Sequence, residues 1–290
     1  MAETEQTTRT YRGNCHCAAF IYEITVPEIK FATACNCSIC VKKGSLYLFP
    51  GEGLKIIKGG DDLVSYTFGE GNYTHQFCGN CGNAVLVHNP KSPPGMKTNI
   101  NVRTLQDVDA WKIEIRQYDG AKVGSPYVPP VYSGPEPTAE FEGGKVYHGS
   151  CHCGAVTAAV KVKDALEGEN KELIMECNCS HCRRGGYIWL YPKKGQLLVE
   201  GGENLTHYTY GSHVWRKSFC KTCGVFVFSE PRPMTEEEVA ALPEAARGFY
   251  LTKGDWRPFT LRALNNFDLS IVKPIQADGW GRGDPKYVNP

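Results

Sequence analysis

Two clusters of three cysteines stand out because closely spaced cysteines are typical of metal binding. The first cluster reads CNCSIC and the second reads CNCSHC, so the cysteines have the same spacing in both. They are Cys35, Cys37, Cys40, Cys177, Cys179 and Cys182. Three protein ligands with one exchangeable position describe a catalytic zinc ion, whereas structural zinc has four protein ligands. We therefore predict an open zinc site at each cluster.

The other eight cysteines form pairs that flank each cluster, with a C-x-C pair before it and a C-x-x-C pair after it. These residues are Cys15, Cys17, Cys78, Cys81, Cys151, Cys153, Cys220 and Cys223. Two short chelating pairs that meet in the fold make a closed four-sulfur zinc site, whose metal-binding energy is also folding energy. The alternative is a disulfide protein or scattered buried thiols, but the regular spacing favours metal. The pattern predicts four zinc ions per chain.

A histidine or carboxylate could instead complete each three-cysteine site. His181 lies inside the second cluster, but Ile39 takes its place in the first. Similarly, His75 corresponds to Lys217, so neither histidine is a shared fourth ligand. Two histidines recur, His16 and His152. Each lies between the cysteines of a C-x-C pair, and we expect its side chain to point away from the metal.

Basic residues follow both three-cysteine clusters, as Lys42-Lys43 and Arg183-Arg184. Such side chains are suited to bind an anionic substrate, for example a peptide carboxylate. Ordinary solvated charges are an equally good interpretation of the same residues.

The elements that position these cysteines occur twice in the chain. The segment 35–81 aligns without a gap on 177–223, and 18 of 47 positions are identical. A stretch rich in proline, glycine and acidic residues, 124–144, is typical of a linker. We therefore predict two tandem zinc-binding domains, residues 1–140 with the linker and residues 141–290.

Each copy consists mainly of short segments rich in β-branched and aromatic residues, bounded by glycine or proline, which predicts strands. The expected strands lie within 20–26, 45–50, 54–60, 63–69 and 83–88, and within 155–162, 187–192, 196–202, 205–211 and 225–230. One convincing helix is predicted at 235–248, where Thr235 opens a capping box and Pro243 would kink or end the helix. The fold class is therefore all-β.

The charge and hydropathy of the chain limit the classes of partner that we expect. The formal net charge of +1 provides no electrostatic argument for nucleic acid or an anionic membrane. No apolar run is long enough to span a membrane, and the N-terminal residues MAETEQTTRTYRG lack an apolar signal region. We expect a cytoplasmic protein, with a nuclear location also compatible.

The seven-cysteine arrangement, read twice over 11–130 and 147–290, resembles the glutathione-dependent formaldehyde-activating enzymes and the related centromere protein V. The resemblance implies a β-tent fold with a structural four-cysteine zinc and a catalytic three-cysteine zinc that engages glutathione. Ser38 and Ser180 match the serine of the family motif. The simplest members of the family have one domain, whereas this chain has two in tandem. The second copy also carries a six-residue insertion before its three-cysteine cluster and an extra helix after its last cysteine pair.

Three functions are compatible with these observations. The first, which the resemblance favours, is a zinc-dependent carbon–sulfur lyase acting on a glutathione or other thiol adduct, similar to an S-(hydroxymethyl)glutathione synthase. The second is a non-enzymatic zinc module that binds partners, as centromere protein V suggests. The third is a zinc store or redox sensor that uses an exposed thiolate cluster.

Overall fold

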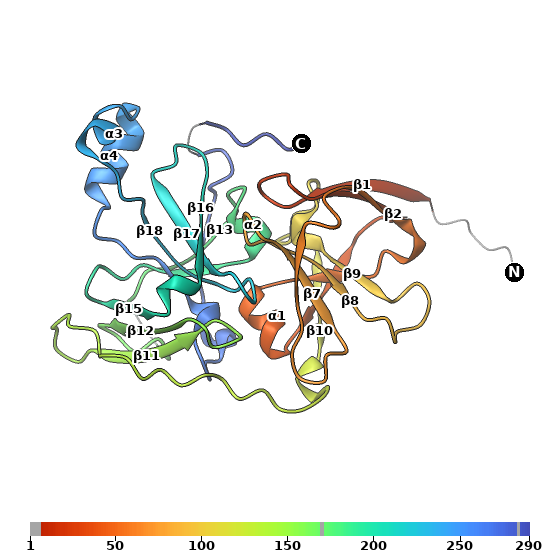
Figure 1. Cartoon of the computed structure of the whole chain (residues 1–290), viewed down its shortest axis with the longest axis horizontal. Helices are drawn as coiled ribbons and strands as arrows, with labels where there is room; N and C mark the ends of the chain where they lie inside the picture. Colours follow the sequence, from red (N-terminus) through yellow and green to blue (C-terminus); the bar gives the residue numbers. More distant parts are fainter. Residues whose placement is uncertain (1–6, 169–170, 283–284) are drawn as a thin grey trace, which may run out of the picture. The chain divides into compact units, whose positions relative to one another are not determined.

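A computed structural model describes residues 7–168, 171–282 and 285–290. The first six residues of the polar N-terminal stretch lie outside this description. The chain divides into two compact units (Figure 1). Unit 1 runs to Tyr127 and takes in Arg183–Gly186 and Val288–Pro290; unit 2 comprises Val128–Cys182 and Tyr187–Tyr287. The domain boundary near residue 140 stays a prediction.

Each unit is built from a three-stranded sheet and a seven-stranded sheet. In unit 1 the small sheet has the order β1 (Thr8–Asn14), β2 (Ile21–Pro27), β5 (Leu54–Lys58). The large sheet has the order β10 (Glu114–Tyr118), β3 (Phe31–Cys35), β4 (Tyr47–Leu48), β9 (Thr98–Asn101), β8 (Ala84–His88), β7 (Thr74–Cys78), β6 (Leu63–Tyr66).

Unit 2 repeats this topology strand for strand. Its small sheet has the order β11 (Lys145–Ser150), β12 (Thr157–Val162), β15 (Leu197–Glu200). Its large sheet has the order β16 (Leu205–Thr209), β17 (Trp215–Cys220), β18 (Phe226–Pro231), β19 (Phe259–Thr260), β14 (Ile188–Leu190), β13 (Ile174–Cys177), β20 (Ile275–Ala277). The prediction of a tandem, mainly β protein is confirmed.

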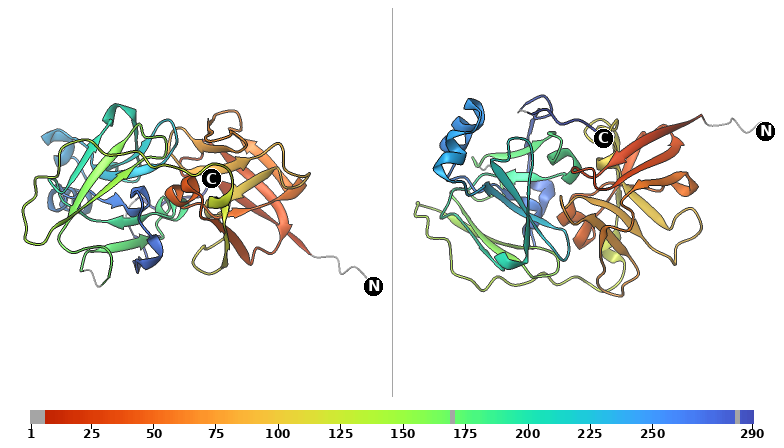
Figure 2. Two further views of the ribbon diagram at one scale, coloured as in Figure 1. Left: turned by 90° about the horizontal axis from the view of Figure 1, so that it is seen from below. Right: turned by 45° about the horizontal axis from the view of Figure 1, so that its top comes forward.

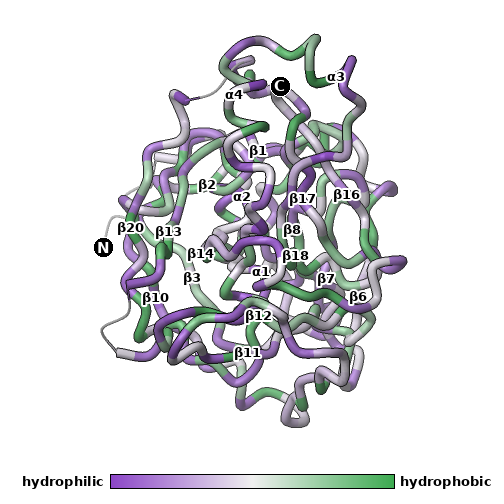
Figure 3. The backbone as a smooth tube through the Cα atoms, turned by 90° about the vertical axis from the view of Figure 1, so that its left-hand side faces the viewer, coloured by the Kyte–Doolittle hydropathy of each residue, from purple (hydrophilic) through white to green (hydrophobic). Residues whose placement is uncertain are grey.

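The strands form where apolar residues alternate with polar ones. Along β2, every second residue from Tyr22 to Val26 is buried while those between them are more exposed, so one face packs on the core. Figure 3 shows hydrophobic and hydrophilic residues mixed along the backbone. All ten predicted segments contain a strand. Strands such as β7 (THQFC) and β17 (WRKSFC) were not predicted, because their many polar residues obscure the alternation of apolar and polar positions.

One parallel strand pair in each unit brings a distant loop to the three-cysteine cluster. In unit 1, β10 pairs with β3 so that Tyr118 lies opposite Cys35. In unit 2, β20 pairs with β13 so that Ala277 lies opposite Cys177. Because parallel strands end at the same edge of a sheet, the residues after β10 and β20 must pass beside the cysteines.

The predicted helix at 235–248 is two helices, α3 (Glu236–Ala240) and α4 (Glu244–Thr252). Thr235 caps α3 in a capping box as predicted, and Pro243 separates the helices as the N-cap of α4. This pair is the blue helical segment in Figure 1 and in both views of Figure 2. Within the described residues, no helix combines the length and the apolar character needed to cross a membrane.

Two further short helices correct the expectation of a single helical region. They are α1 (Ser38–Lys43) and α2 (Cys182–Gly185), which overlap the three-cysteine clusters. Gly44 ends α1 in the left-handed conformation, with its N–H bonded to the carbonyl of Val41. A helix of one or two turns carries too short a pattern to be recognised from hydrophobic periodicity.

Candidate metal centres

The two C-x-C and C-x-x-C pairs of each unit meet as predicted. In unit 1, the sulfur of Cys17 lies 3.6 Å from that of Cys15 and 3.5 Å from that of Cys78. In unit 2, the sulfur of Cys153 lies 3.6 Å from those of Cys151 and Cys220. These separations are too long for disulfides and match the edge of a zinc–sulfur tetrahedron with bonds of about 2.3 Å. The residues therefore fit a closed zinc site in each unit.

Backbone turns hold these sulfurs in the same way in both units. The amide N–H of Phe20 donates to the sulfur of Cys15 at 3.3 Å, and that of Val156 donates to Cys151 at the same distance. The turn in unit 1 places Ala18 at φ 61°, where unit 2 has Gly154 at φ 84°. Amide donors stabilise thiolates, so the turns prepare the sulfurs for a cation.

The three-cysteine clusters also form in both units. Within each cluster the three sulfurs lie within 4.8 Å of one another, and no histidine nitrogen or carboxylate oxygen of the described residues joins them. In unit 1, Cys35 ends β3 and Cys40 lies in α1, so a strand-to-helix turn gathers the ligands. Each cluster therefore offers three sulfur ligands for a metal ion. We call these clusters the first triplet and the second triplet.

The asparagine of each CNC motif fastens a distant loop beside its triplet. In unit 1, the side-chain oxygen of Asn36 accepts the N–H of Ala121 at 2.8 Å. In unit 2, the side-chain oxygen of Asn178 accepts the N–H groups of Gly279 and Trp280 at 2.7 and 2.9 Å. The cysteine spacing did not predict these loops, because they contribute no ligand. The feature of the sequence that marks these loops is the dipeptide Asp-Gly, which occurs at 119–120 and at 278–279. The distance between these two dipeptides along the chain differs from the distance between the two triplets, so the repeat is hard to recognise.

A glycine in each loop lies directly against a cysteine sulfur. A Cβ atom on Gly120 would be 2.3 Å from the sulfur of Cys35. On Gly279 it would be 2.5 Å from the sulfur of Cys177. Any other residue would collide with the ligand, so this close approach requires glycine.

The thiols of each triplet share their protons unequally when no cation is bound. In the first triplet, hydrogen bonds from Cys37 and Cys40 lower the pKa of Cys35 to about 3, despite its partial burial. Donating to Cys35 raises the pKa of Cys37 to about 11, and donation to the other two sulfurs raises the pKa of Cys40 well above its usual range. One thiolate held by two thiols is a cluster that a dication would bind by displacing protons.

The second triplet shows the same division with a different thiolate. Hydrogen bonds from Cys177 and Cys182 lower the pKa of Cys179 well below its usual range, and the charge of Lys217 lowers it further. Donating to Cys179 raises the pKa of Cys177 to about 11. Hydrogen bonds to Cys177 and Cys179, together with burial, raise the pKa of Cys182. The positive charge of Lys217 opposes this increase.

Aromatic side chains line both triplets. In unit 2, the indole N–H of Trp189 donates to the sulfur of Cys182 at 3.3 Å, and the hydroxyl of Tyr210 lies 3.8 Å from the sulfur of Cys179. Burial, followed by the charges of the cysteines, raises the pKa of Tyr210 well above its usual range. Tyr210 therefore stays protonated and acts as the donor. In unit 1, the hydroxyl of Tyr47 lies 4.0 Å from Cys40.

The histidines that lie within the cysteine motifs, His16, His152 and His181, are buried outside the sulfur clusters. His181 is fully buried and stacks on the rings of Tyr187 and Tyr210, at centroid distances of 5.5 and 5.2 Å. His16 and His152 are also buried. The backbone N–H of His16 donates to the side chain of Asn83 at 2.8 Å.

The basic residues after the triplets are not ordinary solvated charges. Lys42, Lys43 and Arg184 are buried. The ammonium of Lys43 lies 4.6 Å from the centre of the Phe77 ring, a cation–π contact. Of the two motif serines, Ser180 is buried and Ser38 is the first residue of α1.

Comparison with known proteins finds a matching family model and a similar solved structure. The model of the family described as glutathione-dependent formaldehyde-activating enzyme matches twice, over residues 10–120 and 146–258. A solved structure, described as a Rhodobacter sphaeroides protein, is similar to this chain with 26% sequence identity. The similarity covers 44% of this chain and 97% of that one, with a TM-score of 0.33.

Proposed function

Because this chain belongs to the glutathione-dependent formaldehyde-activating enzyme family, we propose that it is a zinc-dependent carbon–sulfur lyase acting on a glutathione or other thiol adduct. The observation that carries the proposal is the triplet, three gathered sulfurs that no histidine or carboxylate of the described residues completes. Such a site leaves one position for the sulfur of a substrate. The four-cysteine clusters then serve as closed structural sites, with four zinc ions per chain.

The proposed reaction joins a thiol to formaldehyde. The sulfur forms a bond to the carbonyl carbon, the carbon–oxygen π bond breaks, and the thiol proton ends on the oxygen, which produces an S-hydroxymethyl adduct. The reverse reaction cleaves the carbon–sulfur bond. Zinc supplies a positive charge that lowers the pKa of a bound thiol, and the thiolate is the reactive nucleophile.

The chain's own residues position that chemistry. The catalytic ligands would be Cys35, Cys37 and Cys40 in one domain and Cys177, Cys179 and Cys182 in the other. Gly120 and Gly279 leave room beside one sulfur of each triplet, and Asn36 and Asn178 fasten the loops that carry these glycines. These contacts fix the ligands before the substrate arrives, which reduces the reorganisation that the reaction requires.

Thiol-dependent turnover tests the proposal. Zinc-loaded protein is mixed with ¹³C-formaldehyde and glutathione, and exchange between the free aldehyde and S-(hydroxymethyl)glutathione is measured by NMR. We expect exchange faster than the uncatalysed reaction, and loss of this acceleration in the Cys37→Ser, Cys179→Ser double variant. Absence of acceleration with glutathione and with other thiols would contradict the lyase and favour the non-enzymatic zinc module.

The cysteine chemistry also bears on location. Fourteen cysteines, none of them in a disulfide, suit a reducing compartment in which glutathione is abundant. We therefore propose that the protein works in the cytoplasm.

A further inference from the structure

The two triplets have different surroundings although their cysteines have the same spacing. Since 35–81 and 177–223 align without a gap, each residue near the first triplet has a counterpart 142 positions later. Among the pairs that differ near the triplets are Tyr47 and Trp189, Phe68 and Tyr210, and His75 and Lys217. In unit 2 these side chains provide a closer hydrogen-bond donor, a hydroxyl at the position of Phe68 and a positive charge.

The positive charge comes from Lys217. Its ammonium lies 4.8 Å from the centre of the Trp189 ring, whose N–H donates to Cys182. Lys217 therefore places a positive charge on the ring that donates to the second triplet. In unit 1 the corresponding His75 is buried, with its ring 5.7 Å from that of Phe68.

The first triplet has no lysine at the position that corresponds to Lys217, which His75 occupies. The buried Lys43 of the same unit directs its ammonium to the ring of Phe77.

The hydroxyl that distinguishes the second triplet belongs to Tyr210. It lies 3.8 Å from the sulfur of Cys179 and is held among stacked rings, 5.2 Å from that of His181 and 5.8 Å from that of Tyr208. At the corresponding place in unit 1, Phe68 stacks on Tyr66 at 6.0 Å but has no hydroxyl. Only unit 2 therefore offers a hydroxyl at this position.

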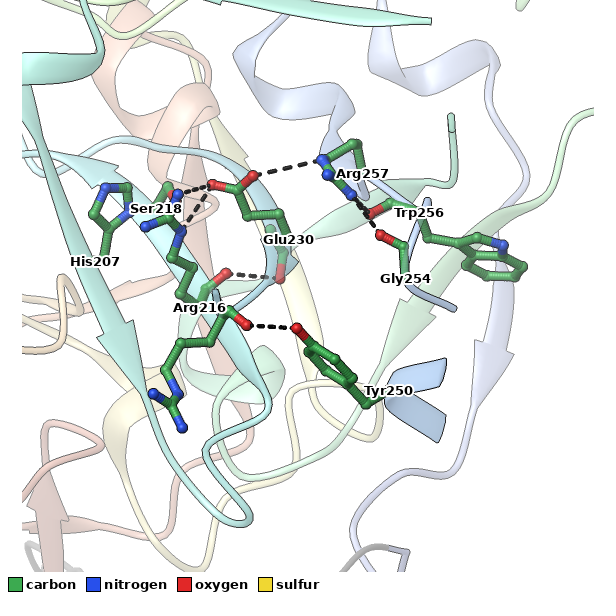
Figure 4. Close-up of polar contacts among 10 residues, drawn as sticks. His207, Arg216, Ser218, Glu230, Tyr250, Gly254, Trp256 and Arg257 are labelled. Atoms are coloured by element: carbon green, nitrogen blue, oxygen red, sulfur yellow. Dashed lines mark hydrogen bonds and ion pairs between the residues drawn. The ribbon is translucent and has the colours of Figure 1, made fainter. Parts of the chain in front are cut away.

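Ion pairs on the opposite face of β17 hold in place the strand that carries Lys217. Arg216 and Lys217 are consecutive in β17, so their side chains leave opposite faces of the sheet. Figure 4 shows Glu230 between two arginines, with Arg216 at 2.6 Å and Arg257 at 3.5 Å. All three side chains are largely buried, so this network anchors β17 to the segment that follows α4. The helices α3 and α4 form an insertion that unit 1 lacks.

Charge decides what each triplet can accept. Three cysteine thiolates around a zinc ion carry a net charge of about −1, and a thiolate in the fourth position brings it to about −2. A partly buried site tolerates that charge only with a nearby cation or additional donors. We propose that the second triplet is the working site, in which Lys217 and Tyr210 select an anionic thiolate as fourth ligand. The proposal rests on the function above and identifies the domain that performs it.

The test measures thiol binding by full-length cobalt-substituted protein, without any turnover. Two parent variants each retain one triplet: Cys37→Ser keeps the second and Cys179→Ser keeps the first. Each is titrated with glutathione and with 2-mercaptoethanol, and the sulfur-to-cobalt charge-transfer band reports occupancy of the fourth position. We expect the Cys37→Ser protein to bind both thiols about tenfold more tightly, the effect of one partly screened charge.

Side-chain variants in the Cys37→Ser protein assign the cause. Lys217→Met should weaken thiol binding about tenfold, and Tyr210→Phe should weaken it by a smaller factor. The matched control is Lys253→Met, which also removes an ammonium stacked on a tryptophan, 4.1 Å from the ring of Trp256. That control should bind thiols like its parent.

Each result supports or overturns a defined claim. Equal binding by the two triplets, or an unchanged Lys217→Met variant, would overturn this inference and leave the proposed function standing. Absence of thiol binding at both triplets would instead overturn the proposed function. If a cysteine variant does not fold, His75→Lys and Lys217→His in the otherwise native chain provide the same comparison. The first should increase and the second decrease the share of cobalt that responds to thiol, and no change would refute the inference.

Discussion

Gly279 lies so close to Cys177 that a Cβ atom on the glycine would be 2.5 Å from the cysteine sulfur. The contact joins the loop after β20 to a ligand about 100 residues earlier, and the same relationship recurs between Gly120 and Cys35. Each triplet therefore depends on a loop that contributes no ligand.

The first prediction is that Gly279→Ala weakens metal binding at the second triplet about 10- to 100-fold, as expected when a group that orients a ligand is disturbed. The added methyl must displace either the sulfur or the loop. Gly281→Ala is the matched control, because a Cβ atom there meets nothing within 4 Å. Competition with a chromophoric chelator measures both affinities, and equal values for the two variants would contradict the role of Gly279.

The second prediction concerns the asparagine that fastens the loop. Asn178→Leu removes the acceptor of two backbone N–H groups and should cost about 1–3 kcal/mol of stability in unit 2. Asn178→Asp keeps an acceptor oxygen and should retain most of that stability. Chemical denaturation of the metal-loaded variants makes the comparison, and an Asn178→Leu protein as stable as the parent would show that the loop is held by other contacts.

Metal content and its structural effect form the third prediction. We expect close to four zinc ions per chain by elemental analysis, and a value near two would mean that the triplets are empty. Cys17→Ser should lower the melting temperature of its domain strongly, because structural zinc supplies folding free energy. Cys37→Ser should leave the fold largely intact while removing thiol binding at the first triplet alone. Similar losses of thermal stability in both variants would argue against an open triplet.

The fourth prediction is that each triplet releases about two protons when zinc binds near neutral pH. Cys35, with a pKa of about 3, is already a thiolate, whereas Cys37, with a pKa of about 11, and Cys40 still hold protons. Zinc affinity should therefore rise with pH through the neutral range and fall on acidification. Proton uptake by a pH indicator in weakly buffered solution measures the stoichiometry, and a pH-independent affinity would contradict this protonation pattern.

The fifth prediction uses a backbone difference between the units. Ala18 has φ 61°, a conformation that costs a residue with a Cβ atom about 1–2 kcal/mol. Ala18→Gly should therefore stabilise unit 1 by about 1 kcal/mol, and the reverse change, Gly154→Ala, should destabilise unit 2. Denaturation of both zinc-loaded variants checks the pair. A destabilising Ala18→Gly would show that entropy lost by the more flexible chain exceeds the strain relieved.

Local patterns were sufficient to predict the strands whose apolar residues are regularly spaced and the capped helix at Thr235. They failed for β7 and β17, whose polar residues are stabilised by pairing with neighbouring strands, and for α1, which is too short to show a helical period. Tertiary pairing overrides weak local preference in such segments.

The sequence by itself determined the groups of cysteines and their duplication, because a metal site requires particular ligand types at short spacing and these can be read along the chain. Only the tertiary structure decided what surrounds each group. The parallel pairing of β20 with β13 brings Gly279 to Cys177, and the packing of β17 and β14 brings Lys217 and Trp189 to the second triplet. Such contacts join residues far apart in the chain, and no local pattern specifies which distant residues the folded sheets will bring together.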